Sequence, residues 1–331
     1  MRIAIIGAGL AGLTCARQLM AHGHAVTVYE KSDSAGGRMS TRETELGGFD
    51  HGAQYFTARQ PAFQRQVATW RRAGLIDLWK ARLVTLEAGV ATPAGLSGQR
   101  FVAVPGMNAL GRHLAHDLGV RTGQRVTRIE SYHGGWLLRV SAETIAIEAS
   151  AGPFDAVIIA MPADQATALL AAVPSMASKV AQARLAPCWS LLLGFEQKLG
   201  LGYDGAWIRH SRLAWIAHDA SKPQRRPGEH WVGHASTEWS AEHLEDDPER
   251  VKEKLLKAFH SATGSDVQPV YAAVHRWRFA QAVEPLPSTC LWDPQLRIGA
   301  CGDWFSAGLE GAGRIENAYL SAAALAESIA S

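Results

Sequence analysis

The stretch IAIIGAGLAGLTCARQL, residues 3–19, decides the fold of this chain. It opens with a short apolar run rich in isoleucine, which is typical of a buried parallel strand. Glycines follow in the spacing G-x-G-x-x-G, and a helical pattern begins at Thr14. A second apolar run, AVTVYE at residues 25–30, ends in an acid. The order of strand, glycine turn, helix, strand and acid predicts a βαβ unit of an α/β domain.

This order is also the fingerprint of a dinucleotide-binding turn. Gly7 permits the tight turn, Gly9 leaves room for a pyrophosphate, and Gly12 lets the helix pack close to the strand. The helix N-terminus offers N–H groups and a positive dipole to phosphates, and an acid can accept hydrogen bonds from a ribose diol. The residues expected to contact the nucleotide are Gly7, Ala8, Gly9, Leu10, Ala11, Gly12, Glu30 and Lys31.

Composition narrows the class of protein. The 331 residues suggest two domains, and the net charge of +2 comes without a basic stripe, so we expect no nucleic-acid partner. The four cysteines are far apart, and neither CxxC nor HExxH occurs, so we expect no disulfide framework and no metal site. No apolar run approaches the roughly 20 residues that span a membrane. The first apolar run is too short for a signal peptide, which predicts a soluble, cytoplasmic protein.

A second glycine turn lies in KSDSAGGRMSTRE, residues 31–43. Two adjacent glycines allow a close backbone approach, and the arginine that follows offers a bidentate fork to a phosphate. The turn resembles the second motif of FAD-dependent amine oxidases and their relatives, where Gly-Gly-Arg places the arginine near the FAD pyrophosphate. The resemblance implies FAD rather than NAD. The contacts that it implies are Gly36, Gly37, Arg38 and Met39.

The next stretch, FDHGAQYFTAR at residues 49–59, resembles the renalase-like branch of that family. The resemblance implies that this segment runs beside the isoalloxazine ring of FAD. Gly52, Ala53 and Gln54 would bring backbone and an amide near the ring, and Tyr55 would pack around it. In flavoproteins of this type a valine entering the following β-meander pairs its backbone with adenine, and Val126 is the matching position.

The carboxyl end carries a third resemblance, in LRIGACGD at residues 296–303. It is similar to the family's third FAD motif, where a strand ends in Gly-Asp and the aspartate binds the ribityl chain or a phosphate. A helix then points its N-terminus at the flavin pyrimidine. The residues implied are Gly302, Asp303, Gly311, Ala312 and Ile315. No cysteine occupies the position that amine oxidases use for covalent attachment, so non-covalent FAD is expected.

These segments predict an α/β fold with two parts. The FAD-binding Rossmann-like domain, of the two-dinucleotide-binding-domain type, is expected from residues 1–60, 98–165 and 287–331. A discontinuous α+β substrate domain is expected from residues 61–97 and 166–286. Short runs rich in β-branched and aromatic residues within it predict an antiparallel sheet.

The resemblance covers essentially the whole chain. It implies oxidation of the 2- and 6-dihydro isomers of NAD(P)H to NAD(P)+, with O2 reoxidising the flavin to H2O2. Hydride transfer from a dihydropyridine needs positioning rather than a protein base. The substrate-side candidates are His234, His275, Trp277 and Arg278, each of which is equally explained as an ordinary sheet or surface residue. Two alternatives stay open, a flavin-dependent amine oxidase and a non-catalytic FAD-binding protein.

Overall fold

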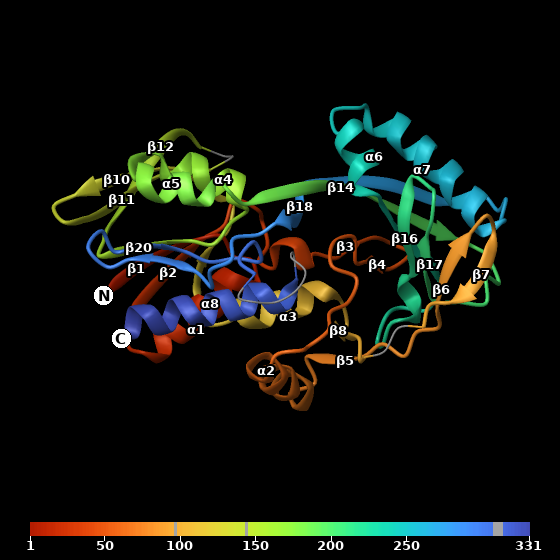
Figure 1. Ribbon diagram of the computed structural model, residues 1–331, viewed down its shortest axis with the longest axis horizontal. Helices are drawn as coiled ribbons and strands as arrows, with labels where there is room; N and C mark the ends of the chain where they lie inside the picture. The colour runs from red at the N-terminus through yellow and green to blue at the C-terminus, as the bar shows by residue number, and fades with distance from the viewer. Residues whose placement is uncertain (96–97, 143–144, 307–313) are drawn as a thin grey trace.

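The computed structural model describes residues 1–95, 98–142, 145–306 and 314–331 (Figure 1). A six-stranded sheet forms one half of the molecule. Its order is β19 (Leu291–Asp293), β20 (Ile298–Ala300), β13 (Ala156–Ile159), β1 (Arg2–Ile6), β2 (Ala25–Tyr29) and β9 (Gly119–Arg121). All neighbours are parallel except β19 and β20, which are antiparallel. This arrangement confirms the predicted α/β class.

Two layers cover this sheet, because successive side chains of a strand point to opposite faces. Ile3 and Ile5 of β1 pack with the helices on one face, and Ala4 and Ile6 pack with the elements on the other. The helices of the first layer are α1 (Leu10–Ala21), α3 (Met107–Ala115) and α8 (Ile315–Ala330). The second layer consists of β10 (Gln124–Tyr132), β11 (Gly135–Ala142), β12 (Ile145–Phe154), α4 (Ala163–Leu169), η2 (Leu170–Ala172) and α5 (Pro174–Val180).

A seven-stranded sheet forms the other half. Its order is β18 (Tyr271–Glu284), β14 (Arg184–Phe195), β17 (Glu229–Ala235), β16 (Leu213–His218), β15 (Gly205–Ile208), β6 (Leu83–Glu87) and β7 (Val90–Pro93). The pairing is antiparallel as predicted, apart from β15 with β6, which is parallel. Helices α6 (Thr237–Glu242) and α7 (Pro248–Thr263) cover one face, which leaves the other face toward the half that contains the six-stranded sheet (Figure 1).

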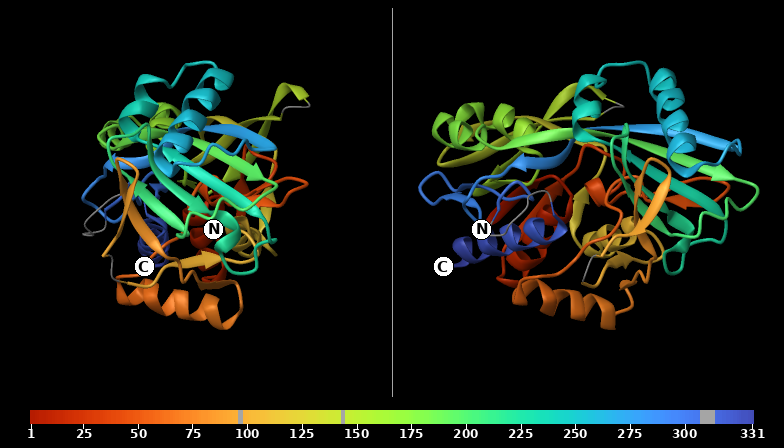
Figure 2. Two further views of the ribbon diagram at one scale, coloured as in Figure 1. Left: turned by 90° about the vertical axis from the view of Figure 1, so that its right-hand side faces the viewer. Right: turned by 45° about the vertical axis from the view of Figure 1, so that its right-hand side comes forward.

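Strands β14 and β18 connect the two halves. Leu185 of β14 and Ala282 of β18 pack in the core beside α4 and α5, whereas Leu191 and Leu193 pack under α7. Figure 1 and the right view of Figure 2 show these two strands running along the molecule beside each other. The substrate-side face is therefore held by continuous strands rather than by a flexible linker.

Residues 61–103 are divided between the two halves of the molecule. Helix α2 (Pro61–Arg72) ends shortly before Gly74, which takes a φ of +70°. The chain then forms β5 (Ile76–Leu78), which pairs with β8 (Phe101–Ala103). Phe63 and Trp70 of α2 pack in the same core as Ile3, so this part of the predicted substrate domain packs on the half that contains the six-stranded sheet. The domain boundaries stay a prediction.

The remaining short elements lie between the halves. They are η1 (Gly37–Met39), β3 (Arg42–Glu43), β4 (Gly48–Phe49) and η3 (Asp219–Ser221). Among the residues that the structure describes, no helix combines the length and apolar character that crossing a membrane requires.

Candidate functional site

The glycines of the first turn divide into two kinds. A Cβ on Gly12 would lie 1.9 Å from the carbonyl oxygen of Gly7, and one on Gly7 would lie 2.3 Å from that of Ala160. These two glycines therefore allow neighbouring backbone segments of the protein to pack closely. A Cβ on Gly9 would meet nothing within 4 Å. Gly9 is also the N-cap of α1 and supplies no side-chain cap, so the first amides of Leu10, Ala11 and Gly12 have no intrahelical partner. An open, uncapped helix N-terminus fits a diphosphate.

The carboxylate of Glu30 holds this turn in place through two hydrogen bonds. It is buried, with one oxygen accepting from the amide of Ala8 at 2.8 Å and the other from the amide of Ser32 at 2.9 Å. The carbonyl of Ala8 in turn accepts from the amide of Gly36 at 2.8 Å, which brings the second glycine turn against the first. Each carboxylate oxygen keeps acceptor capacity for a ribose hydroxyl, which stays a prediction, and Lys31 beside it is exposed.

Arg38 and Asp303 meet although they are 265 residues apart. The guanidinium donates to both carboxylate oxygens, at 2.7 and 2.9 Å, and also to the carbonyl of Ala280 at 3.0 Å. The second and third glycine-containing motifs are therefore joined by a bidentate ion pair. The predicted contacts of Arg38 with a phosphate and of Asp303 with ribityl hydroxyls would therefore be made while the two side chains remain paired with each other.

The remaining predicted cofactor contacts lie around the same region. Met39 is buried, and Val126 lies at a bulge where β10 pairs with β11. The amide of Gly302 donates to Ser321 of α8 at 3.1 Å, which fixes the Gly-Asp turn to the helix that begins at Ile315. Gly311 and Ala312 lie outside the described residues.

Residues 50–54 are here called the platform segment. One carbonyl oxygen of this segment accepts hydrogen bonds from three strands of the seven-stranded sheet. The carbonyl oxygen of His51 accepts from Ser190 Oγ at 2.7 Å, Trp277 Nε1 at 3.0 Å and His234 Nε2 at 3.2 Å. These donors come from β14, β18 and β17, and Ser190 pairs in register with both His234 and His275. Three of the four predicted substrate-side residues therefore gather behind the platform segment.

Arg278 is the fourth, and the structure places it elsewhere. It lies next to Trp277 on β18, so its side chain points to the opposite face of the sheet. There it is exposed and pairs with Glu245. Arg278 therefore lies apart from the other three candidates, because alternation along the strand separates neighbours, and its substrate-side role stays a prediction.

The histidines behind the platform segment are held neutral. The ring of His51 stacks on Trp277 with centroids 5.3 Å apart and meets the edge of His275 at 4.7 Å. Burial is the main cause that lowers the pKa of His51, of His234 and of His275, each to about 4. For His275 the neighbouring positive charge of Arg42 lowers the pKa further, since Arg42 Nη2 lies 3.3 Å from its Nδ1.

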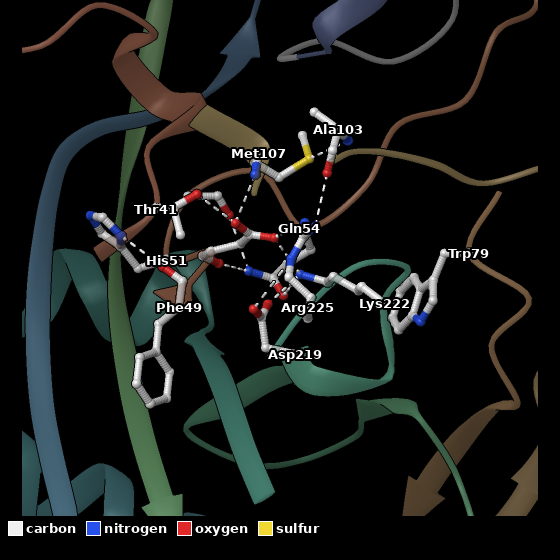
Figure 3. A network of polar contacts seen from close by, with 12 residues as sticks. Thr41, Phe49, His51, Gln54, Trp79, Ala103, Met107, Asp219, Lys222 and Arg225 are labelled. Carbon is white, nitrogen blue, oxygen red and sulfur yellow. Dashed lines mark hydrogen bonds and ion pairs between the residues drawn. The ribbon is translucent and has the colours of Figure 1, made fainter. Parts of the chain in front are cut away.

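On its other side the platform segment enters a buried group of charges, Asp50, Asp219, Lys222 and Arg225, here called the ion quartet (Figure 3). Lys222 Nζ lies 3.1 Å from Asp50 Oδ2 and also contacts Asp219. Arg225 Nη2 donates to Asp50 at 2.6 Å, and its Nη1 reaches the carbonyl of Pro105 at the same distance. The side chains of both aspartates and of Lys222 are fully buried.

The two carboxylates of the quartet differ in acidity. Burial alone would raise the pKa of Asp50, but Lys222, Arg225 and hydrogen bonds from the Met107 amide and Thr41 outweigh burial and lower it to about 2. For Asp219, burial and the negative charge of Asp50 raise the pKa, and the nearby cations offset this only in part. Asp50 is therefore the permanent anion of the group.

The quartet also sets the orientation of Gln54. Its amide nitrogen donates to the carbonyl of Asp50, and its amide oxygen accepts from Lys222 Nζ at 3.3 Å. The backbone beside it is equally constrained, because a Cβ on Gly52 would lie 2.1 Å from the carbonyl of Arg38. That same carbonyl accepts from the amide of Ala53 at 2.8 Å. The platform segment is thus a rigid strip of backbone between the two halves.

Beyond the platform segment lies an aromatic cluster. Tyr55 lies 5.9 Å from both Trp79 and Trp215 by ring centroid, and Trp207 lies 4.6 Å from Trp215. Cations border the cluster: the Arg100 guanidinium is 5.7 Å from the Tyr55 ring. Lys222 Nζ is 5.8 Å from the Trp79 ring. Trp215 is buried, and its indole N–H has no partner in the described part of the chain.

Sequence reasoning missed the ion quartet. Asp50 stands beside His51 and close to Gln54, so the sequence does not show that its carboxylate is buried and requires a partner. The partners lie in SKPQRR, residues 221–226, which looks like a solvated loop. Within the described ranges no group of His, Cys, Asp and Glu could hold a metal ion.

Comparisons with known proteins agree with this geometry. A model of the NAD(P)-binding Rossmann-like domain matches residues 5–70, and a model of the flavin containing amine oxidoreductases matches residues 85–330. The 4,4'-diapophytoene desaturase (4,4'-diaponeurosporene-forming) of Staphylococcus haemolyticus is 48% identical over 52 residues, 16% of this chain and 10% of that protein. The desaturase of the same name from Staphylococcus aureus (strain Newman) is 44% identical over 52 residues. The chain thus matches only a tenth of the length of these curated relatives.

Solved structures share the fold along the whole chain. The "Putative protoporphyrinogen oxidase" from Exiguobacterium sp. 255-15 has a TM-score of 0.78 at 12% identity, covering 99% of this chain and 98% of that one. Putrescine oxidase bound to putrescine has a TM-score of 0.72 at 14% identity, covering 99% of both chains. At such identities the likeness concerns the fold alone.

Proposed function

Because the chain belongs to the family of flavin containing amine oxidoreductases, we propose that it oxidises the 2- and 6-dihydro isomers of NAD(P)H to NAD(P)+. In this reaction non-covalent FAD supplies the acceptor for the hydride, and O2 then takes the electrons to give H2O2. The protein's own part is to hold the cofactor, to orient a dihydropyridine ring and to keep the surrounding charges fixed.

The observation that carries this proposal is the charge beside the aromatic cluster. Arg100 and Lys222 border the rings of Tyr55 and Trp79. The buried carboxylates nearby, Asp50 and Asp219, are already paired with Lys222 and Arg225. Lys222 is fully buried and balanced by these carboxylates, so Arg100 supplies the positive charge beside the cluster. A site that Arg100 borders, and whose described neighbouring carboxylates are already paired, disfavours a protonated amine and suits a ring that carries acceptor or anionic groups.

The titratable groups support the same chemistry. Oxidation of a dihydropyridine yields an aromatic ring, so hydride transfer leaves no proton for a base to remove. His234 uses its ring to hold the His51 carbonyl, and its lowered pKa keeps it neutral. A group that is both neutral and engaged in positioning fits a reaction driven by orientation.

An amine oxidase is the second candidate. The aromatic cluster favours it, since rings facing one another at 4.6–6.5 Å offer an apolar wall to a neutral amine. The Arg100 guanidinium beside the cluster counts against it, because most amines are protonated near neutral pH.

Anaerobic reduction of the bound flavin distinguishes these functions. We expect the absorbance of the oxidised holoprotein near the flavin maximum to bleach rapidly with 6-dihydroNAD and to stay constant with a panel of primary and secondary amines. Bleaching by amines alone would refute the proposal. Absence of bleaching by either class would point to the non-catalytic FAD-binding alternative.

A further inference from the structure

A second recognition surface lies beside the aromatic cluster, in a groove of about 860 Å3. Its walls are Thr57–Arg59, one side of α2, and the segment that leads into β8 at Phe101. The volume falls within the range of small-molecule sites. Figure 2 shows α2 at the lower edge of the molecule in both views, where it is open to solvent.

The groove adjoins the place where the proposed reaction would occur. Thr57–Arg59 directly follow Tyr55 and Phe56, and Phe56 pairs with Phe101 on the opposite wall. The amide of Arg59 donates to Glu316, at the start of α8, at 2.8 Å. One wall is therefore bounded by the aromatic cluster on one side and by the first turn of α8 on the other.

The charge of the groove is positive at two separate places. Arg59 lies just before α2, and Arg71 and Arg72 lie in its last turn, so about 18 Å of helix separates them. No acidic side chain is among the described lining residues. Within the described residues, none of these three arginines forms an ion pair.

The interior between these cations is partly apolar, with Ala58, Val67, Ala68 and Phe101 in the lining. Arg100 does not line the groove but adjoins Gln99 and Phe101, which do; it lies over Tyr55 and has a buried Nε without a partner in the described part of the chain. A ligand that suits this pattern is extended, carries anionic groups at two places and has apolar ring surface between them. Arginine is the side chain best suited to bind phosphate, since its fork matches two phosphate oxygens.

We propose that this groove binds the diphosphate and adenosine part of the dinucleotide substrate, and that Arg71 and Arg72 recognise a 2′-phosphate. The inference rests on the proposed function for the identity of the redox ring, but the groove itself is assigned from its own residues. It follows that the protein favours the form of the dinucleotide that carries the 2′-phosphate.

Binding to the FAD-loaded protein tests the groove without turnover. Isothermal titration of the oxidised holoprotein is expected to give a dissociation constant for NADP+ about tenfold lower than for NAD+. Arg71→Gln/Arg72→Gln should abolish this preference and leave NAD+ binding nearly unchanged. Arg59→Gln should weaken both ligands by about tenfold. Flavin content, measured in each variant, reports whether the fold and the cofactor are retained.

Arg65→Gln is the matched control. Arg65 lies on the same helix and carries the same charge, but it does not line the groove. Equal affinities for the two dinucleotides in the unaltered protein, or an equal effect of Arg65→Gln and Arg71→Gln/Arg72→Gln, would overturn the proposal.

The 6-dihydro isomer of nicotinamide riboside, which lacks every phosphate, separates this inference from the proposed function. One outcome is that neither the riboside nor the 6-dihydro dinucleotides reduce the flavin, while NADP+ still binds in a way that depends on Arg71 and Arg72. This outcome supports the groove as a binding site and refutes the proposed reaction. If 6-dihydroNADP reduces the flavin equally fast and with equal apparent affinity in all the arginine variants, the groove is refuted and the reaction stands.

Discussion

The first glycine turn and the platform segment differ in how they are built. The turn uses main-chain groups and small residues within 30 positions of one another, with Glu30 accepting from the amide of Ala8. The platform segment uses side chains from distant parts of the chain, such as Lys222, which lies 172 residues from Asp50. A turn built from backbone tolerates few changes of shape, whereas a segment held by buried charges tolerates few changes of charge.

The largest effect that we expect is acid sensitivity of the platform side. His51, His234 and His275 have a pKa near 4 when folded, against about 6.5 when unfolded, because burial disfavours their charged forms. Between pH 4 and 6.5 the unfolded chain therefore binds more protons, and the free energy of unfolding rises with pH. Each histidine contributes up to about 1.4 kcal/mol per pKa unit, so several kcal/mol are lost by pH 4.

Denaturant unfolding at intervals from pH 4 to pH 7.5 measures this dependence. His234→Gln should reduce the slope of the unfolding free energy against pH by the equivalent of up to one proton between pH 4 and pH 6.5. A free energy of unfolding that stays constant from pH 6.5 to pH 4 would contradict the neutral, buried state of these histidines.

The next effect concerns the ion quartet. Lys222→Met leaves Asp50 and Asp219 buried with one cation fewer, and removing one partner of a buried pair costs about 3–5 kcal/mol of unfolding free energy. Lys252→Met is the control, because Lys252 pairs with the largely exposed Glu249, and such a pair contributes about 0–1 kcal/mol. Thermal and denaturant unfolding should separate the two variants clearly, and similar losses in both would refute the structural role of the quartet.

A smaller effect separates the two kinds of glycine in the first turn. Gly12→Ala places a methyl against the Gly7 carbonyl and should cost about 1–3 kcal/mol of unfolding free energy. Gly9→Ala meets no protein atom, so the stability of the cofactor-free protein should not fall while FAD binding weakens. If Gly9→Ala binds FAD as tightly as the unaltered protein, the phosphate cradle is elsewhere.

The smallest effect concerns Glu30. Glu30→Ala removes an acceptor for the ribose and for the Ala8 amide, and should weaken FAD binding about tenfold. Glu30→Gln keeps one acceptor oxygen and should bind FAD with intermediate affinity. Equilibrium dialysis of the cofactor-free variants measures both constants, and unchanged retention in Glu30→Ala would count against the ribose role.

The difference between the two regions also explains what the sequence could predict. The glycine turn and its acid, Gly7, Gly9, Gly12 and Glu30, could be predicted because these residues are close in sequence. Their spacing is typical of one backbone conformation. His234, His275 and Trp277 were nominated from residue type and from their place in the predicted substrate domain, and the structure brings them together because cross-strand neighbours share a face. Arg278 was nominated in the same way and lies on the opposite face.

The ion quartet could not be predicted from one sequence. A lysine in a polar loop and an aspartate in an aromatic stretch carry no mark of their contact, since the fold alone brings residues 50 and 222 together. The same holds for the pairing of Arg38 with Asp303, in which each residue was predicted separately as a cofactor ligand. Long-range pairing of side chains is the part of the site that required a structure.

Release of the flavin tests the central claim most directly, namely that both ends of the chain and the platform segment form one site for non-covalent FAD. We expect the purified protein to be yellow, and acid precipitation should leave about one FAD per chain in the supernatant. A colourless protein that is stabilised by NAD+ alone would contradict this account, and flavin that stays with the precipitate would contradict non-covalent binding.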